Sequence, residues 1–379
     1  MQKKKILLGV GAIALSVAML SGCSARSGSS SGTSGSAAPS GSASAAAAIP
    51  AGSTIGVALP AKTSQNWVLA GAAFTKAITA AGFKPDVQYA NATSPVPDQQ
   101  QQVTAMTTKG DKVIVIGAAD GSQLGSQVAA AKKAGIVVIA WDRLLTNTPN
   151  VDYYVAFNNY HVGELQGQAL LDGLAKLKGT KPWNVELFAG SPDDSNAGIF
   201  FKGAMSVLQP KIDDGTLKVA SGQTKFNQVD TQGWLPQNAQ TRMTNLLTAH
   251  YSKTKIDGVL SPNDTLGRAI LTATKAAGKP NPVVTGQDSE TASIPLIMNG
   301  TQYSTIFKNT TDEANAAVTL IKELASGAKP SNVVIDAKQN NNGVKVVPAV
   351  ELSPVLVTKE NAVEAYAPDP TLEALAKKG

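Results

Sequence analysis

Polar side chains follow several predicted β-strands, and their chemical types suit a ligand rich in hydroxyl groups. Asp142 and Arg143 come directly after one apolar run, and Asn263, Asp288 and Lys308 come after three others. A hydroxyl both donates and accepts hydrogen bonds, and planar carboxylate, carboxamide and guanidinium groups can each bind two neighbouring hydroxyls. These residues therefore predict a binding site for a neutral, polyhydroxylated ligand.

Two tryptophans and one further loop extend the predicted site. Trp67 follows the first predicted strand, Trp234 lies in a Gly-Trp-Leu-Pro turn, and Asn196 ends a polar loop that begins at Gly190. The face of an indole ring can stack on the C–H face of a pyranose. The set of polar and aromatic residues therefore favours a sugar over other polyols.

Each of these residues also has a structural interpretation. Asn263 can serve as a helix N-cap, and Asp142 with Arg143 can form an ion pair that only stabilises the fold. The tryptophans can belong to the core, and Lys308 can be solvated. The functional interpretation depends on their shared position, because one polar strand end is common but a series of them is not.

The chain that must position these residues alternates strand and helix from Ser53 onward. Runs such as Val113–Ile116 are apolar throughout, which indicates parallel strands buried on both faces. Ligands of open parallel sheets bind beyond the carboxyl ends of the strands, where the polar residues stand. The predicted strands are Thr54–Leu59, Asp86–Tyr89, Lys112–Gly117, Ile136–Trp141, Tyr153–Phe157, Asn184–Ala189, Asp257–Leu260, Val283–Gly286 and Ser304–Phe307. Helices are predicted between most of these strands, for example Val68–Ala81, Gln99–Lys109, Ser122–Ala134, Val162–Leu177, Asn238–His250, Leu266–Ala277 and Asp312–Ala325.

The length of this region bears on the number of lobes. Residues 51–379 hold more strand–helix units than one sheet usually carries. The predicted fold class is therefore α/β, with two doubly wound parallel-sheet lobes.

The composition excludes several other kinds of site. One Cys and two His among 379 residues argue against a disulfide framework, a zinc site or any other metal site, and no cofactor is predicted. The net charge of +6 includes Lys3, Lys4 and Lys5, and without these three it falls to +3. No basic patch clusters in the remaining sequence, so we do not expect nucleic-acid binding.

The N-terminus predicts export. Three lysines precede the apolar run Ile6–Leu20, which is shorter than the roughly 20 residues of a membrane-spanning helix and is typical of a signal peptide. Leu-Ser-Gly-Cys at the end of this run resembles the lipobox of bacterial lipoproteins, which implies a signal peptide over 1–22 and a lipidated Cys23. Residues 23–50 then form a Ser/Gly/Ala-rich tether that is predicted to be disordered.

A set of motifs in the folded region resembles the monosaccharide-binding proteins of bacterial ABC importers, which have the type 1 periplasmic-binding-protein fold. The nearest branch is similar to the xylose-binding protein and the ChvE-type multiple-sugar-binding proteins. The resemblance covers about residues 55–370. It is carried by Ala-Trp-Asp-Arg-Leu at 140–144, Val-Ala-Phe-Asn-Asn at 155–159, Ala-Gly-Ser-Pro-Asp-Asp-Ser-Asn-Ala at 189–197, Gln-Gly-Trp-Leu-Pro at 232–236, Leu-Ser-Pro-Asn-Asp at 260–264 and Val-Thr-Gly-Gln-Asp at 284–288.

This resemblance implies two lobes joined by a three-strand hinge and closing on one sugar. It implies an N-terminal lobe of residues 53–157 with 308–340, and a C-terminal lobe of 158–307 with 341–370. The sugar-binding residues that it implies are Asn66, Trp67, Asp142 and Arg143 on the first lobe, Asn196, Trp234, Asn263 and Asp288 on the second, and Lys308 at the hinge.

Two positions depart from the family pattern. Arg often stands before the first tryptophan, where this chain has Asn66, and Phe-Asp-Asn often stands where this chain has Phe157-Asn158-Asn159. The first change removes a cation that would bind the sugar. It leaves open which monosaccharide binds, including the choice between pentose and hexose.

The resemblance implies that the closed, sugar-bound form docks on an ABC permease, outside the cytoplasm and anchored through Cys23; we expect a monomer. A role as a sugar sensor for a chemoreceptor or sensor kinase uses the same site and stays open. A transcription regulator would need an N-terminal DNA-binding domain, where this chain has a signal and a tether. A glycosidase would need a proton donor, and Arg143 and Lys308 would instead hold Asp142 and Asp288 ionised, so no enzyme is predicted.

Overall fold

The computed structural model describes residues 49–62 and 64–379. The predicted signal peptide, Cys23 and nearly all of the predicted tether lie outside the described residues. Statements on lipidation and on the tether therefore stay predictions.

The first lobe is built on a seven-stranded sheet with the order β11-β12-β5-β4-β3-β1-β2. Its neighbours are parallel except for β11, which is antiparallel to β12. The strands are β1 (Thr54–Leu59), β2 (Lys84–Tyr89), β3 (Val113–Ile116), β4 (Val137–Trp141), β5 (Tyr153–Phe157), β11 (Val333–Val334) and β12 (Ala349–Leu352).

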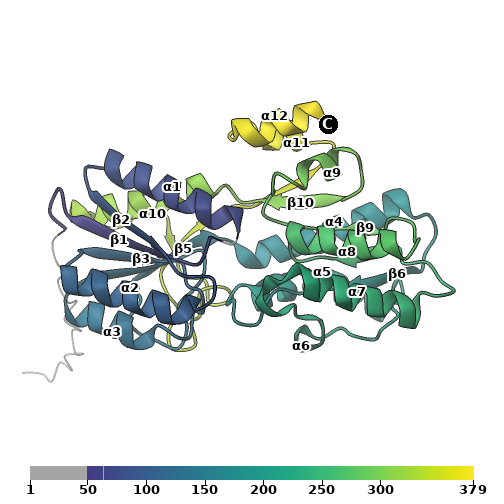
Figure 1. The fold of residues 1–379 in the computed structure, drawn as a ribbon, viewed down its shortest axis with the longest axis horizontal. Coiled ribbons are helices and arrows are strands. Elements are labelled where there is room, and N and C mark those ends of the chain that lie inside the picture. The colour runs from purple at the N-terminus through teal and green to yellow at the C-terminus, as the bar shows by residue number, and fades with distance from the viewer. Residues whose placement is uncertain (1–48, 63) are drawn as a thin grey trace, which may run out of the picture. The chain divides into compact units, whose positions relative to one another are not determined.

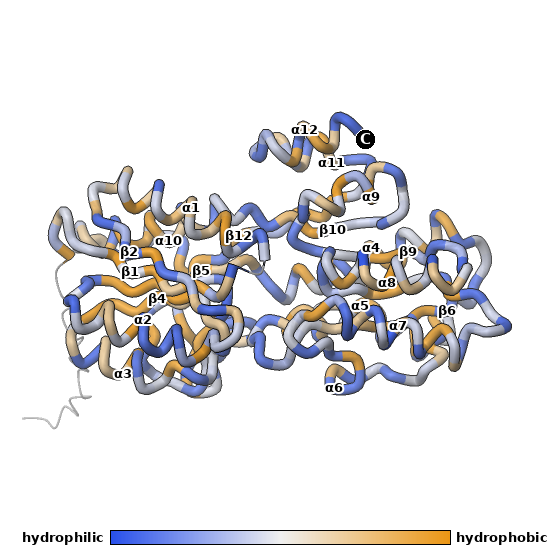
Figure 2. Tube along the Cα trace, viewed as in Figure 1, coloured by the Kyte–Doolittle hydropathy of each residue, from blue (hydrophilic) through white to orange (hydrophobic). Residues whose placement is uncertain are grey.

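Helices cover both faces of this sheet, as Figure 1 shows. Phe74 of α1 and Val318 of α10 belong to one apolar cluster with β1 and β4, and Met106 of α2 and Val128 of α3 belong to another with β3 and β5. The fully apolar strands are buried on both sides for this reason, and hydrophobic residues gather along them in Figure 2. The first lobe is therefore doubly wound, as predicted. The helices are α1 (Gln65–Ala80), α2 (Pro95–Lys109), α3 (Gly125–Lys133) and α10 (Thr310–Ala325).

The second lobe is built on a four-stranded parallel sheet with the order β7-β6-β8-β9 and a two-stranded antiparallel sheet of β10 and β13. A hydrogen bond from the Tyr303 N–H to the Val284 carbonyl (3.0 Å) links β10 to β9. The strands are β6 (Trp183–Leu187), β7 (Leu217–Val219), β8 (Gly258–Leu260), β9 (Val283–Val284), β10 (Ser304–Phe307) and β13 (Val355–Thr358). The helices are α4 (Asn159–Leu177), α5 (Ala197–Asp213), α6 (Phe226–Val229), α7 (Pro236–His250), α8 (Asp264–Ala276), α9 (Ile294–Met298), α11 (Ala362–Ala365) and α12 (Pro370–Lys378), with a 3-10 turn over Gln232–Trp234.

The chain passes three times between the two lobes, between β5 and α4, between β10 and α10, and between β12 and β13. The sequence predicted that residues 341–370 lie entirely in the C-terminal lobe. The strand pairing shows that the first part of this segment lies in the other lobe. Ala349 pairs with Tyr154 in the first sheet, and the Asn342 amide donates to the carbonyls of Leu145 (3.1 Å) and Thr148 (2.7 Å). Residues 341–352 therefore belong to the first lobe, and the chain returns to the second lobe only at β13.

Among the described residues, no helix combines the length and the apolar character that crossing a membrane requires.

Candidate functional site

Asp142 stands at the end of β4 and is held there by its backbone. Its φ of 59° lies in the left-handed region, and its N–H donates to the Val155 carbonyl (2.9 Å). Its own carbonyl accepts from the Tyr154 hydroxyl (2.7 Å) and from the Asn196 side-chain amide (2.8 Å). Within the described part of the chain no hydrogen bond reaches its carboxylate, which is thus free to accept from a ligand.

The electrostatic surroundings of Asp142 include most of the predicted site. Burial raises the pKa of its carboxyl group to about 6, although Lys308 and Arg143 lower it. The carboxylates of Asp194 and Asp288 act in the same direction as burial. The structure therefore brings the Asp142 and Arg143 of the first lobe close to the Asp288 and Lys308 of the second.

Arg143 is fixed on three sides. Its Nη1 donates to the carbonyls of Ala118 and Ala119 (both 3.3 Å), and its guanidinium carbon lies 5.2 Å from the centre of the Trp67 ring. Its Nε lies 3.2 Å from the Asp194 carboxylate of the second lobe. Nη2 makes no hydrogen bond to any described residue, so its N–H groups are available to a ligand.

Trp67 combines the core and the functional interpretations. It is buried in the apolar cluster beneath α1, with its ring edge-on to Trp141 at 6.0 Å between centroids. It also lies against Arg143. Trp67 therefore packs in the core and also supports Arg143, and its direct contact with a sugar stays a prediction.

Lys308, in the crossing between β10 and α10, forms an ion pair with Asp288 of the second lobe. Lys308 Nζ lies 3.1 Å from Asp288 Oδ1 and 5.4 Å from the centre of the Phe200 ring. Burial alone would lower the pKa of Lys308, but Asp288 and Asp142 together raise it above its usual value. Asp288 has a φ of 89°, and its N–H donates to the Ile306 carbonyl (2.9 Å), which ties the residue to β10. Lys308 is therefore a fixed, permanent cation.

The two asparagines of the second lobe have structural partners. Asn263 is the N-cap of α8, since its Oδ1 accepts from the Leu266 N–H (2.9 Å), and its Nδ2 makes no hydrogen bond to a described residue. Asn196 is buried, its amide donates to Asp142, and its Oδ1 lies 3.3 Å from the Tyr154 hydroxyl. Asn263 keeps its donors for a ligand, whereas Asn196 uses its side chain to join the two lobes.

Trp234 lies in the 3-10 turn and packs against two apolar clusters. Its ring comes so close to Gly190 that a Cβ there would stand 2.1 Å from a ring carbon. Its indole N–H is buried and has no partner in the described structure. A buried donor without a partner is rare in folded proteins, which favours a ligand for Trp234.

Asn66 is positioned at the start of α1. Its Oδ1 accepts from the Thr310 hydroxyl of α10, and it lines a pocket together with Asp288, Lys308 and Asn309. Asn66 therefore lies beside the second-lobe pair, although its oxygen already has a partner.

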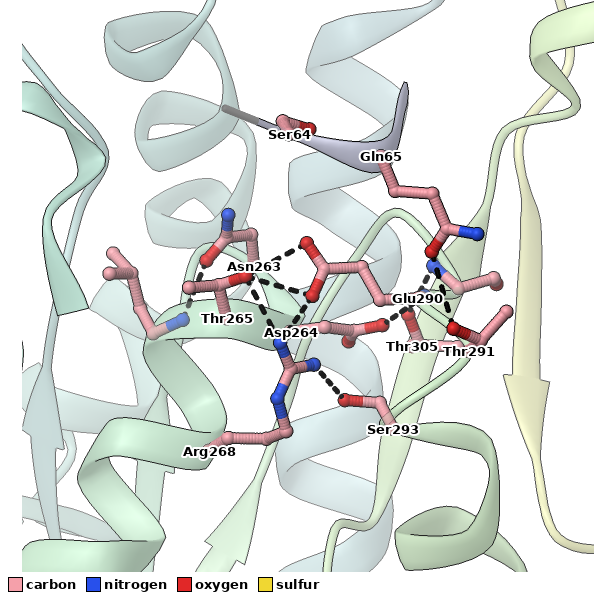
Figure 3. Close-up of polar contacts among 12 residues, drawn as sticks. Ser64, Gln65, Asn263, Asp264, Thr265, Arg268, Glu290, Thr291, Ser293 and Thr305 are labelled. Carbon is pink, nitrogen blue, oxygen red and sulfur yellow. Dashed lines mark hydrogen bonds and ion pairs between the residues drawn. The ribbon is translucent and has the colours of Figure 1, made fainter. Parts of the chain in front are cut away.

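A polar network holds the loop that carries Asp288. Figure 3 shows Arg268 between Glu290 and Ser293, to which its guanidinium donates at 2.5 and 2.7 Å. The buried Asp264 accepts from the Glu290 N–H (2.9 Å) and from Gln302 (2.7 Å). The loop is therefore rigid on its own lobe. It also meets the first lobe where Thr291 donates to Gln65 (3.3 Å).

Two carboxyl groups that sequence reasoning did not assign belong to this site. Asp194 pairs with Arg143, and Glu313 of α10 is buried with its Oε1 unpartnered in the described structure. Burial raises the pKa of Glu313 well above its usual value; Asp142 raises it further, while Lys308 lowers it. Asp194 was visible in the sequence only as part of a polar loop, and Glu313 only as an acidic residue in the first turn of a helix.

The arrangement can bind hydroxyl groups from both sides, with acceptors on Asp142 and Asp288 and donors on Arg143, Lys308, Asn263 and Trp234. No three or more His, Cys, Asp or Glu side chains of the described residues are grouped so that they could hold a metal ion.

Comparisons with known proteins agree with this geometry. The family described as "Periplasmic binding protein domain" matches residues 55–329. The multiple sugar-binding periplasmic receptor ChvE of Rhizobium radiobacter is 48% identical over 313 residues, covering 81% of this chain and 87% of the relative. The D-xylose-binding periplasmic protein of Escherichia coli (strain K12) is 36% identical over 316 residues, covering 83% and 89%. A crystal structure of an ABC transporter solute binding protein from Clostridium phytofermentans with bound β-D-glucose has a TM-score of 0.78 and 37% identity, covering 84% of this chain and 98% of that one.

Proposed function

We propose the following function for this chain, which belongs to the periplasmic binding protein domain family, as its motifs predicted. The chain is an extracytoplasmic solute-binding protein that captures a monosaccharide between its lobes and delivers it to an ABC permease. The observation that carries this function is the set of groups with free hydrogen-bonding capacity, the Asp142 carboxylate, Arg143 Nη2 and Asn263 Nδ2, beside the Asp288–Lys308 ion pair. A ligand with many hydroxyls would satisfy them, and an apolar ligand would leave buried charges without partners.

The sugar that we propose is a pyranose of the xylose, glucose, galactose or arabinose type. The named ligands of similar proteins, D-xylose and β-D-glucose, support this class. Asn66 and Asn158 are the positions that we expect to tune the choice within it.

Closure of the lobes by hinge bending is the mechanism that we propose. The open form admits the sugar; Asp142 and Arg143 bind it on the first lobe, and Asn263 and Asp288 on the second. Closure then excludes water and presents both lobes to the permease. A Kd near 1 μM corresponds to about −8 kcal/mol, which several charge-assisted hydrogen bonds and one stacking contact can supply.

A second function uses the same closed form. The name of the Rhizobium radiobacter relative calls it a receptor, which supports a sensor that presents its sugar to a chemoreceptor or sensor kinase. Deleting the permease that imports the bound sugar separates the two functions, because transport is then lost while a sugar response through a sensor persists.

Anchoring and oligomeric state are also part of the proposal. We propose that Cys23 is lipidated after cleavage behind Gly22, that residues 24–48 tether the folded part to the outer face of the membrane, and that the protein is a monomer. Mass spectrometry of the mature N-terminus would detect the acyl chains. Their absence, or a Cys23→Ser variant that stays on the membrane, would contradict the anchor.

We propose that the site does not catalyse glycoside hydrolysis. The sequence predicted that Arg143 and Lys308 hold Asp142 ionised, but burial outweighs both cations and raises its pKa to about 6. The proposal is supported instead by similar proteins, which are named for binding sugars. Release of a chromophore from nitrophenyl glycosides by the wild-type chain, but not by Asp288→Ala, would show that an enzyme is present.

Calorimetric titration tests the function directly. The chain without its signal and lipid is titrated with D-xylose, D-glucose, D-galactose, L-arabinose, D-fucose and D-ribose. We expect one-to-one micromolar binding to at least one of the first four. No heat with any of them would overturn the proposed ligand class.

A further inference from the structure

We infer that Asp194 is a positioning residue which couples closure of the two lobes to the orientation of Arg143. It belongs to the second lobe and its partner to the first, so the two meet only when the lobes are together. This inference rests on the proposed function, because it concerns how the site closes on a sugar.

Asp194 occupies a buried turn between β6 and α5. Its Oδ1 accepts from the Asn196 N–H (2.9 Å) and its Oδ2 lies 3.2 Å from Arg143 Nε. The side chain is 6% exposed and that of Arg143 is 16% exposed. One carboxylate oxygen therefore holds the turn, and the other reaches across to the opposite lobe.

The contact between Asp194 and Arg143 influences the direction in which the free Nη2 of the guanidinium points. The first lobe alone holds Arg143 through Nη1 and through the face of Trp67. Asp194 adds an ion pair from the opposite lobe, with its Oδ2 3.2 Å from Nε, and Nη2 stays unoccupied by any described residue. Because the contact forms when the lobes close, it favours the closed form that holds the ligand, so affinity improves.

A second contact from the same turn supports the first. Asn196 donates to the Asp142 carbonyl (2.8 Å), and Tyr154, which donates to that same carbonyl, lies within 3.3 Å of Asn196 Oδ1. The turn that carries Asp194 and Asn196 thus contacts the backbone of Asp142 and the side chain of Arg143. We name this pair of contacts, Asp194 with Arg143 and Asn196 with Asp142, the inter-lobe latch.

The latch affects binding by changing the population of the closed form. An apparent dissociation constant rises in proportion as the binding-competent form becomes rarer. Because the latch forms on closure, its loss should speed release of the sugar more than it slows capture. A residue that only stabilises the fold would lower thermal stability without changing release selectively.

The variant Asp194→Asn isolates the ion pair. The Asn side-chain oxygen can still accept from the Asn196 N–H, so the turn is kept, while the amide nitrogen faces the Arg143 guanidinium donor to donor. Asp193→Asn is the matched control, since it makes the same charge change one residue away at an exposed position. Both variants and the wild type are measured with D-xylose and D-glucose by calorimetry and stopped-flow kinetics, and their sugar-free melting temperatures are compared.

We expect Asp194→Asn to raise Kd by about 10-fold or more, chiefly through the dissociation rate, with the sugar-free melting temperature unchanged. Asp193→Asn should match the wild type. Equal Kd and dissociation rate in Asp194→Asn and wild type would overturn the inference, as would an equal loss in Asp193→Asn or a melting temperature that falls in step with affinity. Failure of the wild type itself to bind any sugar would instead overturn the proposed function.

Discussion

The two ion pairs of the site differ in what they connect. Asp288 and Lys308 lie on one lobe at the end of β10, where the chain leaves for the hinge, whereas Arg143 and Asp194 lie on different lobes. Because only the second pair joins the two lobes, we expect it alone to depend on their closure. The site therefore contains one ion pair that holds Lys308 in place and one that we expect to form only when the lobes close.

Removing the local pair should have the largest effect on binding. Asp288→Ala leaves the buried Lys308 without its nearest carboxylate and a sugar hydroxyl without its acceptor. We expect a loss of at least about 1–3 kcal/mol, or about 5- to 150-fold in Kd, measured by calorimetry. The control is Asp312→Ala, which removes an exposed carboxylate from the start of α10. If Asp288→Ala binds as tightly as the wild type, the second-lobe half of the site is wrong.

The pH dependence of binding tests whether the Asp142 carboxylate binds the sugar. Asp142 is faced by Lys308, Arg143, Asp194 and Asp288, and its pKa is about 6. A sugar hydroxyl that donates to the carboxylate favours the ionised form, so affinity should be lost as the pH falls through 6. Between pH 7 and pH 5 we expect a loss of about 10-fold.

Asp142→Asn provides the control for this titration. The carboxamide cannot ionise, so its Kd should be weaker than that of the wild type at pH 7 and nearly constant between pH 5 and pH 7. A wild-type Kd that is equally flat over this range would show that the Asp142 carboxylate does not bind the sugar.

Much of this site could be predicted because its residues follow strands. The apolar runs that end at Trp141 and Phe307 are unambiguous, and a parallel sheet collects such ends at one edge. The predicted strands and helices correspond to β1–β6, β8–β10, α1–α4, α7, α8 and α10, with boundaries shifted by a few residues. The sequence analysis did not name α5, which contains two glycines and a proline, or short segments such as β7 and β11 that depend on their neighbours for pairing.

The remaining parts of the site depend on contacts between distant segments. Asp194 resembles any turn aspartate until Arg143 is placed beside it, and Glu313 resembles an acidic residue that favours a helix N-terminus. Asn196 was predicted to bind the sugar, but its partners Asp142 and Tyr154 lie more than 40 positions away along the chain. Periodicity and strand ends locate a site, but they do not show which of its polar groups are already satisfied.

The effect of removing an uncharged side chain of the second lobe can be compared with the effects of the two ion-pair variants. Trp234→Ala removes a ring that carries no charge and that packs over Gly190. We expect binding to weaken by about 0.5–1.5 kcal/mol, or up to about 10-fold in Kd, with far-ultraviolet circular dichroism unchanged. Loss of the folded spectrum would mean that Trp234 belongs to the core of the lobe, and an unchanged Kd would mean that the ring does not touch the sugar.

The smallest effect on binding is expected at Glu313, a buried carboxyl group that interacts electrostatically with Asp142, Lys308 and Asp288. Its folded-state pKa is raised, so the folded protein binds a proton more tightly than the unfolded chain does, and stability is lost as the pH rises above the unfolded value of 4.5. Glu313→Gln replaces the neutral carboxyl group by a neutral isostere and removes this loss. We expect Kd to change by less than about twofold, and the free energy of unfolding of the variant, measured by denaturant titration, to match the wild type at pH 4.5 and to exceed it increasingly toward pH 8. A variant that is less stable than the wild type at pH 8 would show that Glu313 is ionised and bound to Lys308, which would make it a third member of the local pair.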